Sequence, residues 1–264
     1  MGLTVISLGA GVQSTTLALM AAHREIEPMP DAAIFADTGW EPRAVYDHLA
    51  WLTSPNVLPF PVYRVSNGNI RSDLLANARG ETVGKRSATP PLFVPGDGRE
   101  GMLSRQCTDA YKVEPIAKKL RELIGLVPRQ RAPTSVAVEL WVGISVDEAH
   151  RAKPSRVPWI ERRFPLLDAV MRRWDCRQWL RRNGYPDPPK SSCIGCPYHS
   201  ADQWRALPPD EFADAILVDE AIRGGLRGTH GPLYLHRTLR PLADVDLDAE
   251  PDLFGEECEG LCGV

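Results

Sequence analysis

The sequence lacks an apolar stretch long enough to cross a membrane. Residues 3–22 carry no charge, but two glycines and a polar run over residues 13–16 interrupt them. No basic segment precedes the apolar residues 3–8 and no cleavage site follows them, so no signal peptide is indicated. Ile6 stands where a myristoylation signal needs Ser or Thr. These absences predict a cytoplasmic protein without membrane attachment.

The lack of secretion signals decides how the six cysteines are interpreted. A reducing compartment disfavours structural disulfides, so closely spaced cysteines there indicate metal ligation or catalysis. Cys193 and Cys196 form such a pair, with C-x-x-C spacing. Two sulfurs on one turn can ligate an iron–sulfur cluster, although zinc sites and redox pairs share this spacing.

Acidic and basic residues are unevenly distributed in a chain of 264 residues whose net charge is −3. Residues 151–190 hold eleven Lys and Arg against four Asp and Glu, whereas residues 241–264 hold eight acidic residues and no Lys or Arg. Trp174 and Trp179 lie among five of these arginines. The basic segment suits a nucleic-acid partner such as tRNA or DNA. The alternatives are a solvated helix face and pairing with the acidic tail.

Strands and helices alternate in the first part of the chain, whose 43 % hydrophobic content is enough for a large core. Strands are expected over residues 3–8, 32–36 and 61–65, and helices from Thr15 to about Arg24, from Pro42 through Leu52 and over residues 70–78. This alternation predicts an α/β fold with a doubly wound, mostly parallel sheet. Ligands in such sheets bind beyond the carboxyl ends of the strands.

The later part of the chain is less regular. Residues 79–104 show no period and are expected to form a loop. Beyond them we expect a helix over residues 113–124, a central strand over 136–144, helices over 176–182 and 208–222, and an extended acidic tail.

A glycine-rich turn follows the first predicted strand and opens a helix. In this position, backbone N–H groups and the Ser14 hydroxyl can converge on a phosphate. The turn is not a Walker A loop, because no Lys precedes the Ser or Thr. It resembles the PP-loop of ATP pyrophosphatases, S-G-G-x-D-S, with Ala10 replacing a Gly and Gln13 replacing the Asp. The resemblance implies a nucleotide site that includes Ser7, Gly9, Ala10, Gly11, Gln13, Ser14 and Thr15.

The second predicted strand ends in Asp37-Thr38-Gly39, followed by Trp40 and Glu41. Sulfonucleotide reductases and their relatives carry a similar D-T-G and a nearby acidic residue at this point. The resemblance implies that Asp37, Thr38 and Gly39 bind nucleotide, and that Asp37 also acts in catalysis or in holding Mg²⁺. The alternative is that Asp37 only caps the next helix.

Further segments resemble the same family in the same order. Residues 106–115 resemble its C-C-x-x-R-K-x-x-P segment, which implies a ligand role for Cys107 and a catalytic role for Lys112. Residues 143–151 resemble its G-x-R-x-x-E…R segment, which implies that Gly143 and Arg151 bind nucleotide, although Ser145 replaces the Arg. Residues 165–180 and 192–197 resemble its P-L…W…D-V-W-x-Y-L and S-I-G-C-x-x-C stretches.

The chain is therefore identified as resembling the phosphoadenylyl-sulfate (PAPS) reductase-like branch of the adenine nucleotide α-hydrolase superfamily. The resemblance implies binding of ATP or an adenylyl nucleotide, with Mg²⁺, and sulfur chemistry. We expect a PP-loop nucleotide-binding domain at residues 1–165 and a cysteine-bearing C-terminal lobe and tail at residues 166–264, packed as one unit.

A [4Fe–4S] cluster is expected on Cys107, Cys193 and Cys196. Cys176 is the first candidate for the fourth ligand. His199, which stands at the family's final Cys, is the second, and a tail cysteine or no protein ligand are further alternatives. Cys258 and Cys262 loosely resemble the reductases' terminal E-C-G-L-H, which implies a catalytic role for Cys258. The acidic tail raises the pKa of such a thiol and argues against high reactivity.

Three functions remain open from the sequence. The first is an ATP-using enzyme that transfers sulfur to a nucleic acid or nucleobase, with a sulfur donor protein as a possible partner. The second is a sulfonucleotide reductase, against which the Ser145 substitution, the missing double Cys and the altered tail count. The third is a non-catalytic nucleotide- or cluster-binding component of a larger complex.

Overall fold

The protein is built around one parallel sheet in a computed structural model that describes residues 2–81, 89–96 and 100–248. Its five strands are ordered β3-β2-β1-β6-β7, and every neighbouring pair is parallel. The strands are β1 (Leu3–Leu8), β2 (Ala32–Asp37), β3 (Val62–Ser66), β6 (Val138–Val142) and β7 (Ile160–Arg163). The expected doubly wound α/β sheet is confirmed.

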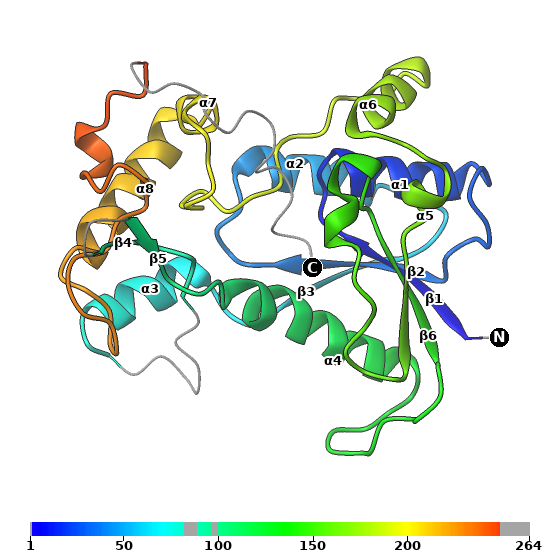
Figure 1. Ribbon diagram of the computed structural model, residues 1–264. Helices are drawn as coiled ribbons and strands as arrows, with labels where there is room; N and C mark the ends of the chain where they lie inside the picture. The colour runs from blue at the N-terminus through cyan, green and yellow to red at the C-terminus, as the bar shows by residue number, and fades with distance from the viewer. Residues whose placement is uncertain (1, 82–88, 97–99, 249–264) are drawn as a thin grey trace.

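Helices cover both faces of this sheet (Figure 1). On one face lie α1 (Val12–Ala22), α2 (Arg43–Leu52), α5 (Pro165–Asp168) and α6 (Arg173–Arg182). The opposite face carries α4 (Glu114–Leu123), which continues a π-helical turn, η1 (Asp109–Val113). α6 packs against α1, so part of the chain beyond residue 165 belongs to the layer that covers the sheet. The domain boundary at residue 165 stays a prediction.

A lobe lies beyond the carboxyl ends of the strands (Figure 1). There α8 packs against α3, beside a short antiparallel strand pair. The elements of the lobe are α3 (Ile70–Ala78), β4 (Phe93–Pro95), β5 (Glu100–Met102), α7 (Ala201–Arg205), α8 (Pro209–Ile222) and the 3₁₀ turn η3 (Leu242–Asp244). A second 3₁₀ turn, η2 (Val146–Arg151), contacts α5 instead. No helix in the described ranges is long and apolar enough to cross a membrane.

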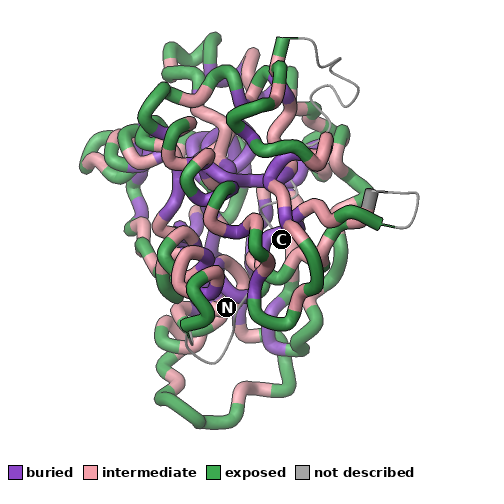
Figure 2. Tube along the Cα trace, turned by 90° about the vertical axis from the view of Figure 1, so that its left-hand side faces the viewer, coloured by how far each residue is buried: buried purple, intermediate pink, exposed green. Residues whose placement is uncertain are grey.

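Side chains of β1 alternate between two apolar layers, as a buried strand requires. Ile6 joins a core with α1, α2 and α6, whereas Val5 joins a second core that includes Leu120 of α4. A third core, which includes Leu92 and Trp204, fills the lobe. Figure 2 shows buried segments through the interior of the molecule and exposed segments around its periphery. The lobe therefore has apolar packing of its own at the edge where ligands of such sheets bind.

Several boundaries differ from those expected from the sequence. α1 begins at Val12 rather than Thr15, so the first turn of the helix is part of the glycine-rich loop. Pro42 has an extended ψ of 148° and lies before α2 rather than inside it. β7 was not anticipated, because three of its four residues are charged and it lies at the sheet edge. The supposed loop at residues 79–104 contains the β4–β5 hairpin.

The buried His48 makes stability depend on pH. Its Nε2 lies 3.0 Å from Thr15 Oγ1 of α1, and burial lowers the pKa of His48 to about 4. Below about pH 6.5 His48 takes up a proton in the unfolded chain, whereas it stays neutral in the folded chain down to about pH 4. The stability that the neutral, buried His48 contributes is therefore present above about pH 6.5 and is lost as the pH falls toward 4. Between pH 7 and 5 the wild type should lose about 2 kcal/mol more than H48Q.

Urea unfolding of both proteins at the two pH values measures this difference. The exposed His230 supplies the matched control, because H230Q also replaces a histidine by glutamine but leaves the buried contact of His48 with Thr15 in place. An H48Q protein that loses as much stability on acidification as the wild type would contradict the assignment.

Candidate functional site

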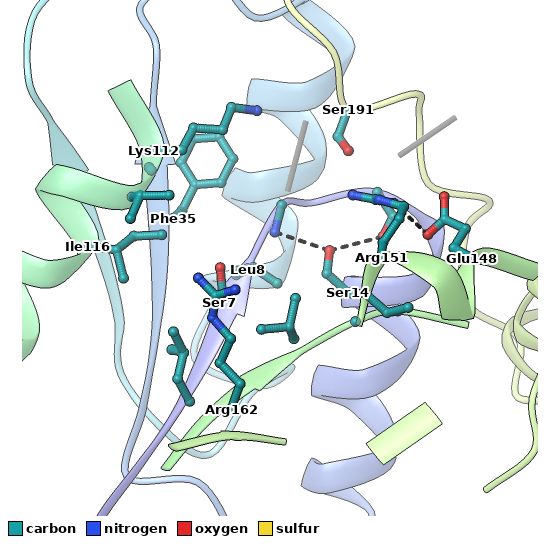
Figure 3. Close-up of a pocket in the computed structure, with 18 of the residues that line it drawn as sticks. Ser7, Leu8, Ser14, Phe35, Lys112, Ile116, Glu148, Arg151, Arg162 and Ser191 are labelled. Atoms are coloured by element: carbon teal, nitrogen blue, oxygen red, sulfur yellow. Dashed lines mark hydrogen bonds and ion pairs between the residues drawn. The ribbon is translucent and has the colours of Figure 1, made fainter. Parts of the chain in front are cut away.

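A large cavity lies where the strand order reverses, beyond the carboxyl ends of β1 and β6. Its volume is about 520 Å³. The loop after β1, the Gly143 turn after β6 and residues of α4 contribute to its lining (Figure 3). In open α/β sheets this crevice is the usual ligand site.

The glycine-rich loop is held in shape by the Ser14 hydroxyl. Gly9 N donates to Ser14 Oγ at 3.1 Å, and Ser14 Oγ donates to the Gly11 carbonyl at 3.3 Å (Figure 3). Gly11 is the N-cap of α1, so the unpaired N–H groups of the first turn and the positive end of the helix dipole lie at the cavity. Ala10 has a φ of 56°, in the region that glycine prefers. This arrangement suits an anion such as a phosphate.

Two glycines of the site are in close contact with other segments, Gly143 with backbone atoms and Gly11 with a serine side chain. A Cβ on Gly143 would lie 2.9 Å from Ser14 N and 3.0 Å from Ser14 Cα. A Cβ on Gly11 would lie 2.5 Å from Ser191 Oγ, on the segment that leads to the cysteine pair. The turn after β6 and the segment before Cys193 therefore fix the position of the loop.

One side of the cavity is apolar and the other is cationic. Leu8, Phe35 and Ile116 line the part between the sheet and α4, where Ser7 and Arg162 also lie (Figure 3). An apolar slot with a few polar groups suits a purine base. The lining includes three carboxylates, of Glu41, Asp109 and Glu148, and eight cationic side chains: Arg105, Lys112, Arg151, Lys153, Arg156, Arg162, Arg173 and Lys190. This excess of positive charge suits a ligand with several phosphates.

The predicted nucleotide residues divide into two groups. Ser7, Gly9, Gly11, Ser14, Gly143 and Arg151 line the cavity. Arg151 forms an ion pair with Glu148 at 2.8 Å. Gln13 instead accepts a hydrogen bond from Arg173 at 3.0 Å, and Thr15 contacts His48 in the core. Gln13 therefore ties α1 to α6 in the structure.

Both carboxylate oxygens of Asp37 accept hydrogen bonds from neighbouring groups of the protein. Its Oδ1 accepts hydrogen bonds from Gly39 N and Tyr46 Oη, both at 2.8 Å. Its Oδ2 accepts two from Arg64, at 2.9 and 2.5 Å. Burial and this contact raise the pKa of Tyr46. Asp37 is outside the lining of both cavities, and its carboxylate organises the turn after β2; its direct role in catalysis or Mg²⁺ binding stays a prediction.

Glu41, four residues on, lines the large cavity instead. Its side chain is 2 % exposed, and its Oε1 lies 3.0 Å from Thr38 Oγ1 and 3.8 Å from Lys112 Nζ. Its Oε2 is buried and has no hydrogen-bond partner among the described residues. The sequence signal for Glu41 is the acidic residue that follows the D-T-G in the reductases and their relatives. Of the two carboxylates near the end of β2, Glu41 lines the large cavity and Asp37 does not.

Three cysteines from two distant segments line a second cavity of about 30 Å³. They are Cys107, which precedes the π-helical turn, and Cys193 and Cys196 of the C-x-x-C turn. Thr38 Oγ1 lies 3.2 Å from Cys193 Sγ. Backbone contacts position the turn, since Ile194 N donates to the Trp40 carbonyl at 2.8 Å and a Cβ on Gly195 would lie 2.1 Å from the Trp40 ring.

The donor set of this second cavity fits three of the four ligands of a [4Fe–4S] cluster. Thiolates are the usual ligands, and Arg105 and Lys112 in the same lining can compensate their negative charge. In the described ranges no group of three His, Cys, Asp or Glu side chains is arranged to hold a metal ion.

Cys176, the first candidate for the fourth ligand, lies apart from the other three cysteines. Cys176 is completely buried on α6, in the core with α1, and not in the lining that Cys107, Cys193 and Cys196 share. Burial raises the pKa of the Cys176 thiol to about 12, which disfavours the thiolate that ligation needs. Its position fits the buried apolar role that small thiols often have.

His199 lies closer to the cysteine pair than Cys176 does in the fold. Its backbone N–H donates to the Cys196 carbonyl at 3.1 Å, and its side chain lines the large cavity with Cys196. Ser192 Oγ lies 2.8 Å from its Nε2. Burial, with Lys190 nearby, lowers the pKa of His199 to about 3, so the ring is neutral. Cys258 and Cys262 lie outside the described residues, and their roles stay predictions.

No protein-family model and no curated protein matches the sequence. Among solved structures, the chain is similar to phosphoadenylyl-sulfate (PAPS) reductase from Candida auris in its phosphate complex, with 13 % identity and a TM-score of 0.41. The similarity covers 71 % of this chain and 76 % of that chain.

The close approach at Gly143 predicts the effect of adding one methyl group. Because the neighbouring atoms are backbone, G143A must displace the first turn of α1 and should weaken ATP binding by roughly tenfold or more while the protein remains folded. Calorimetric titration with ATP measures the change, and circular dichroism checks folding.

The matched control for this substitution is G224A. A Cβ there meets nothing within 4 Å, so ATP affinity should not change. Equal ATP affinity in G143A and the wild type would remove the loop from the nucleotide site.

Proposed function

We propose that this protein is an ATP-using, iron–sulfur-dependent enzyme that transfers sulfur to a nucleic acid or nucleobase. One observation carries the proposal: the large cavity and the cysteine cavity share four lining residues. These are Arg105, Lys112, Cys196 and Tyr198. A nucleotide in the first cavity and sulfur held at the second would therefore lie side by side.

The chain's own residues supply the nucleotide site. The N–H groups of the glycine-rich loop, shaped by Ser14, receive the phosphates, and the apolar slot beside Ile116 receives the adenine. Lys112 extends into the lining between Glu41 and the cysteines and can stabilise negative charge that develops on a phosphate. Attack on the α-phosphate by an oxygen of the acceptor would release pyrophosphate and leave the acceptor adenylylated. Sulfide would then attack the activated carbon and displace AMP, a substitution that needs no oxidant or reductant.

The cysteine cavity supplies the sulfur side. Cys107, Cys193 and Cys196 would hold a [4Fe–4S] cluster, which when bound offers an iron on which sulfide can be carried. His199 and a tail cysteine are the remaining candidates for a fourth ligand. A cluster with three protein ligands is equally compatible with the donor set, because it leaves one iron for sulfide.

Mg²⁺ would be held by the nucleotide phosphates and by Glu41. The buried Oε2 of Glu41 has no hydrogen-bond partner among the described residues and belongs to a side chain that lines the cavity. Oxygen donors of this kind are those that Mg²⁺ prefers. Asp37 acts on this site indirectly, by holding the turn that leads to Glu41.

A sulfonucleotide reductase is the second candidate. The cationic excess of the cavity is compatible with it as well, since a nucleotide with a sulfate and an additional phosphate also carries several negative charges. Such an enzyme would use Cys258 as its nucleophile.

The cluster assignment is tested by iron and sulfide quantitation after anaerobic purification. C107S, C193S and C196S should each lose most of the iron, because each removes a ligand from the shared cavity. C176S is the matched control and should keep the iron, because Cys176 lies in the α1–α6 core. Stoichiometric zinc in place of iron, or iron loss in C176S but not in C193S, would contradict the assignment.

The reaction is tested by product analysis with the same anaerobic protein. Pyrophosphate release from ATP in the presence of tRNA or DNA, with sulfur incorporated into the nucleic acid, is the expected result. Sulfite release from a sulfonucleotide would establish the reductase instead. Binding of both nucleotides without turnover would contradict both enzymatic proposals.

A further inference from the structure

Helix α6 exposes a large aromatic side chain. Trp174 is 67 % exposed, whereas Trp179, one and a half turns further along, is buried in the core with α1. Exposed tryptophan is uncommon, because the ring has much apolar area to bury. Trp174 thus offers a flat apolar surface that the fold itself does not use.

Arginines flank this ring on the same face of the helix. Cys176, Trp179 and Leu180 fix the buried face. Arg177 and Arg181 follow Trp174 at helical spacings of three and seven residues, so they share its outward stripe. An aromatic ring between guanidinium groups along one stripe matches the alternation of base and phosphate in a nucleic-acid strand.

These arginines are only partly neutralised. Arg181 is paired with Asp187 at 3.1 Å, but both side chains are more than half exposed, so the pair is weak and can be exchanged for a phosphate. Arg177 has no ion pair with a carboxylate of the described residues, and the same holds for Arg172 and Arg182 at the two ends of the helix. The face therefore attracts polyanions.

The stripe starts at the nucleotide cavity. Arg173, the first residue of α6, lines that cavity and donates to Gln13 Oε1 at 3.0 Å. Lys153 and Arg156 line the same cavity from the segment after η2. A strand that lies on α6 would thus meet further positive charge where it reaches the cavity.

We propose that α6 is the docking surface for a single-stranded nucleic acid, with one base stacked on Trp174 and the backbone phosphates on Arg177 and Arg181. A neighbouring nucleotide would then reach the cavity beside Arg173. This inference rests on the proposed function, because it names the acceptor as a single strand rather than a duplex or a free base.

Fluorescence anisotropy with labelled single strands of RNA and DNA, roughly twelve nucleotides long and without ATP present, tests the surface. W174A should weaken binding about 5- to 100-fold, the range for loss of one stacked base, and W174F should restore most of it. The R177E/R181E variant should lower the salt dependence by about 0.7 in log–log slope per phosphate contact, whereas W174A should leave the slope unchanged.

The matched control reverses two cations on the opposite face of the sheet. Lys118 and Arg121 lie on α4, so K118E/R121E changes the net charge equally and should keep wild-type affinity. Equal loss in the control, or unchanged affinity in W174A, would overturn the proposal. Tighter binding to a duplex, to vesicles of anionic lipid or to polyglutamate than to single strands would also overturn it.

Calorimetric titration with ATP separates this inference from the proposed function. All α6 variants should bind ATP as the wild type does, because the substituted side chains lie outside the cavity lining. Strand binding through Trp174 in a protein that does not bind ATP would leave the docking surface standing and refute the nucleotide-dependent function. Loss of ATP binding in W174A would overturn the assignment of Trp174 to docking alone.

Discussion

The site depends on one backbone contact, between the turn after β6 and the first turn of α1. Gly143 packs directly against the backbone of Ser14, and any larger residue would separate the two elements. The contact is possible because β1 and β6 are neighbours at the point where the strand order reverses. It places the N–H groups of the loop at the mouth of the crevice, with Ser14 Oγ closing the loop from within. The anion site is therefore a consequence of the sheet topology.

A second constraint joins the glycine-rich loop to the cysteines. Ser191 contacts the loop at Gly11, and Gly195 packs on the ring of Trp40. The C-x-x-C turn is thereby held between the loops that follow β1 and β2, from which it is far apart in the sequence. Glu41 and Lys112 lie at the junction, 3.8 Å apart, with Cys193 Sγ also 3.8 Å from Glu41. Charge at the nucleotide and charge at the sulfur site would act on each other across this junction.

The sequence alone predicts the bounds of those elements whose local signals agree with the fold. Helix α3 matches its expected range of residues 70–78, because Asn69 caps it and accepts a hydrogen bond from Ser72 N. The strand at residues 3–8 and the convergence of Gly9, Ser14 and Gly143 follow from apolar pattern and motif order. The short edge strand β7 carries too much charge to give an apolar signal.

Other features depend on partners that the sequence does not place. The sequence does not show whether Asp37 or Glu41 reaches the cavity. The fold decides it, because β3 places Arg64 beside β2, where its guanidinium binds the carboxylate of Asp37. Cys176 precedes the C-x-x-C pair by fewer than twenty residues. It is nevertheless buried against α1 and outside the cysteine cavity, because α6 packs its apolar stripe on α1. Spacing alone gives no sign of this direction. The exposure of Trp174 follows from the same orientation of the helix.

The central claim is that bound nucleotide lies beside the cysteine site, and electron paramagnetic resonance of the reduced cluster tests it most directly. Addition of a non-hydrolysable ATP analogue to the anaerobic protein should shift the g-values of the cluster, because Lys112 and Cys196 line both cavities. The same addition to G143A should shift them little. A wild-type protein that holds the cluster and binds the analogue with no spectral change would contradict the account.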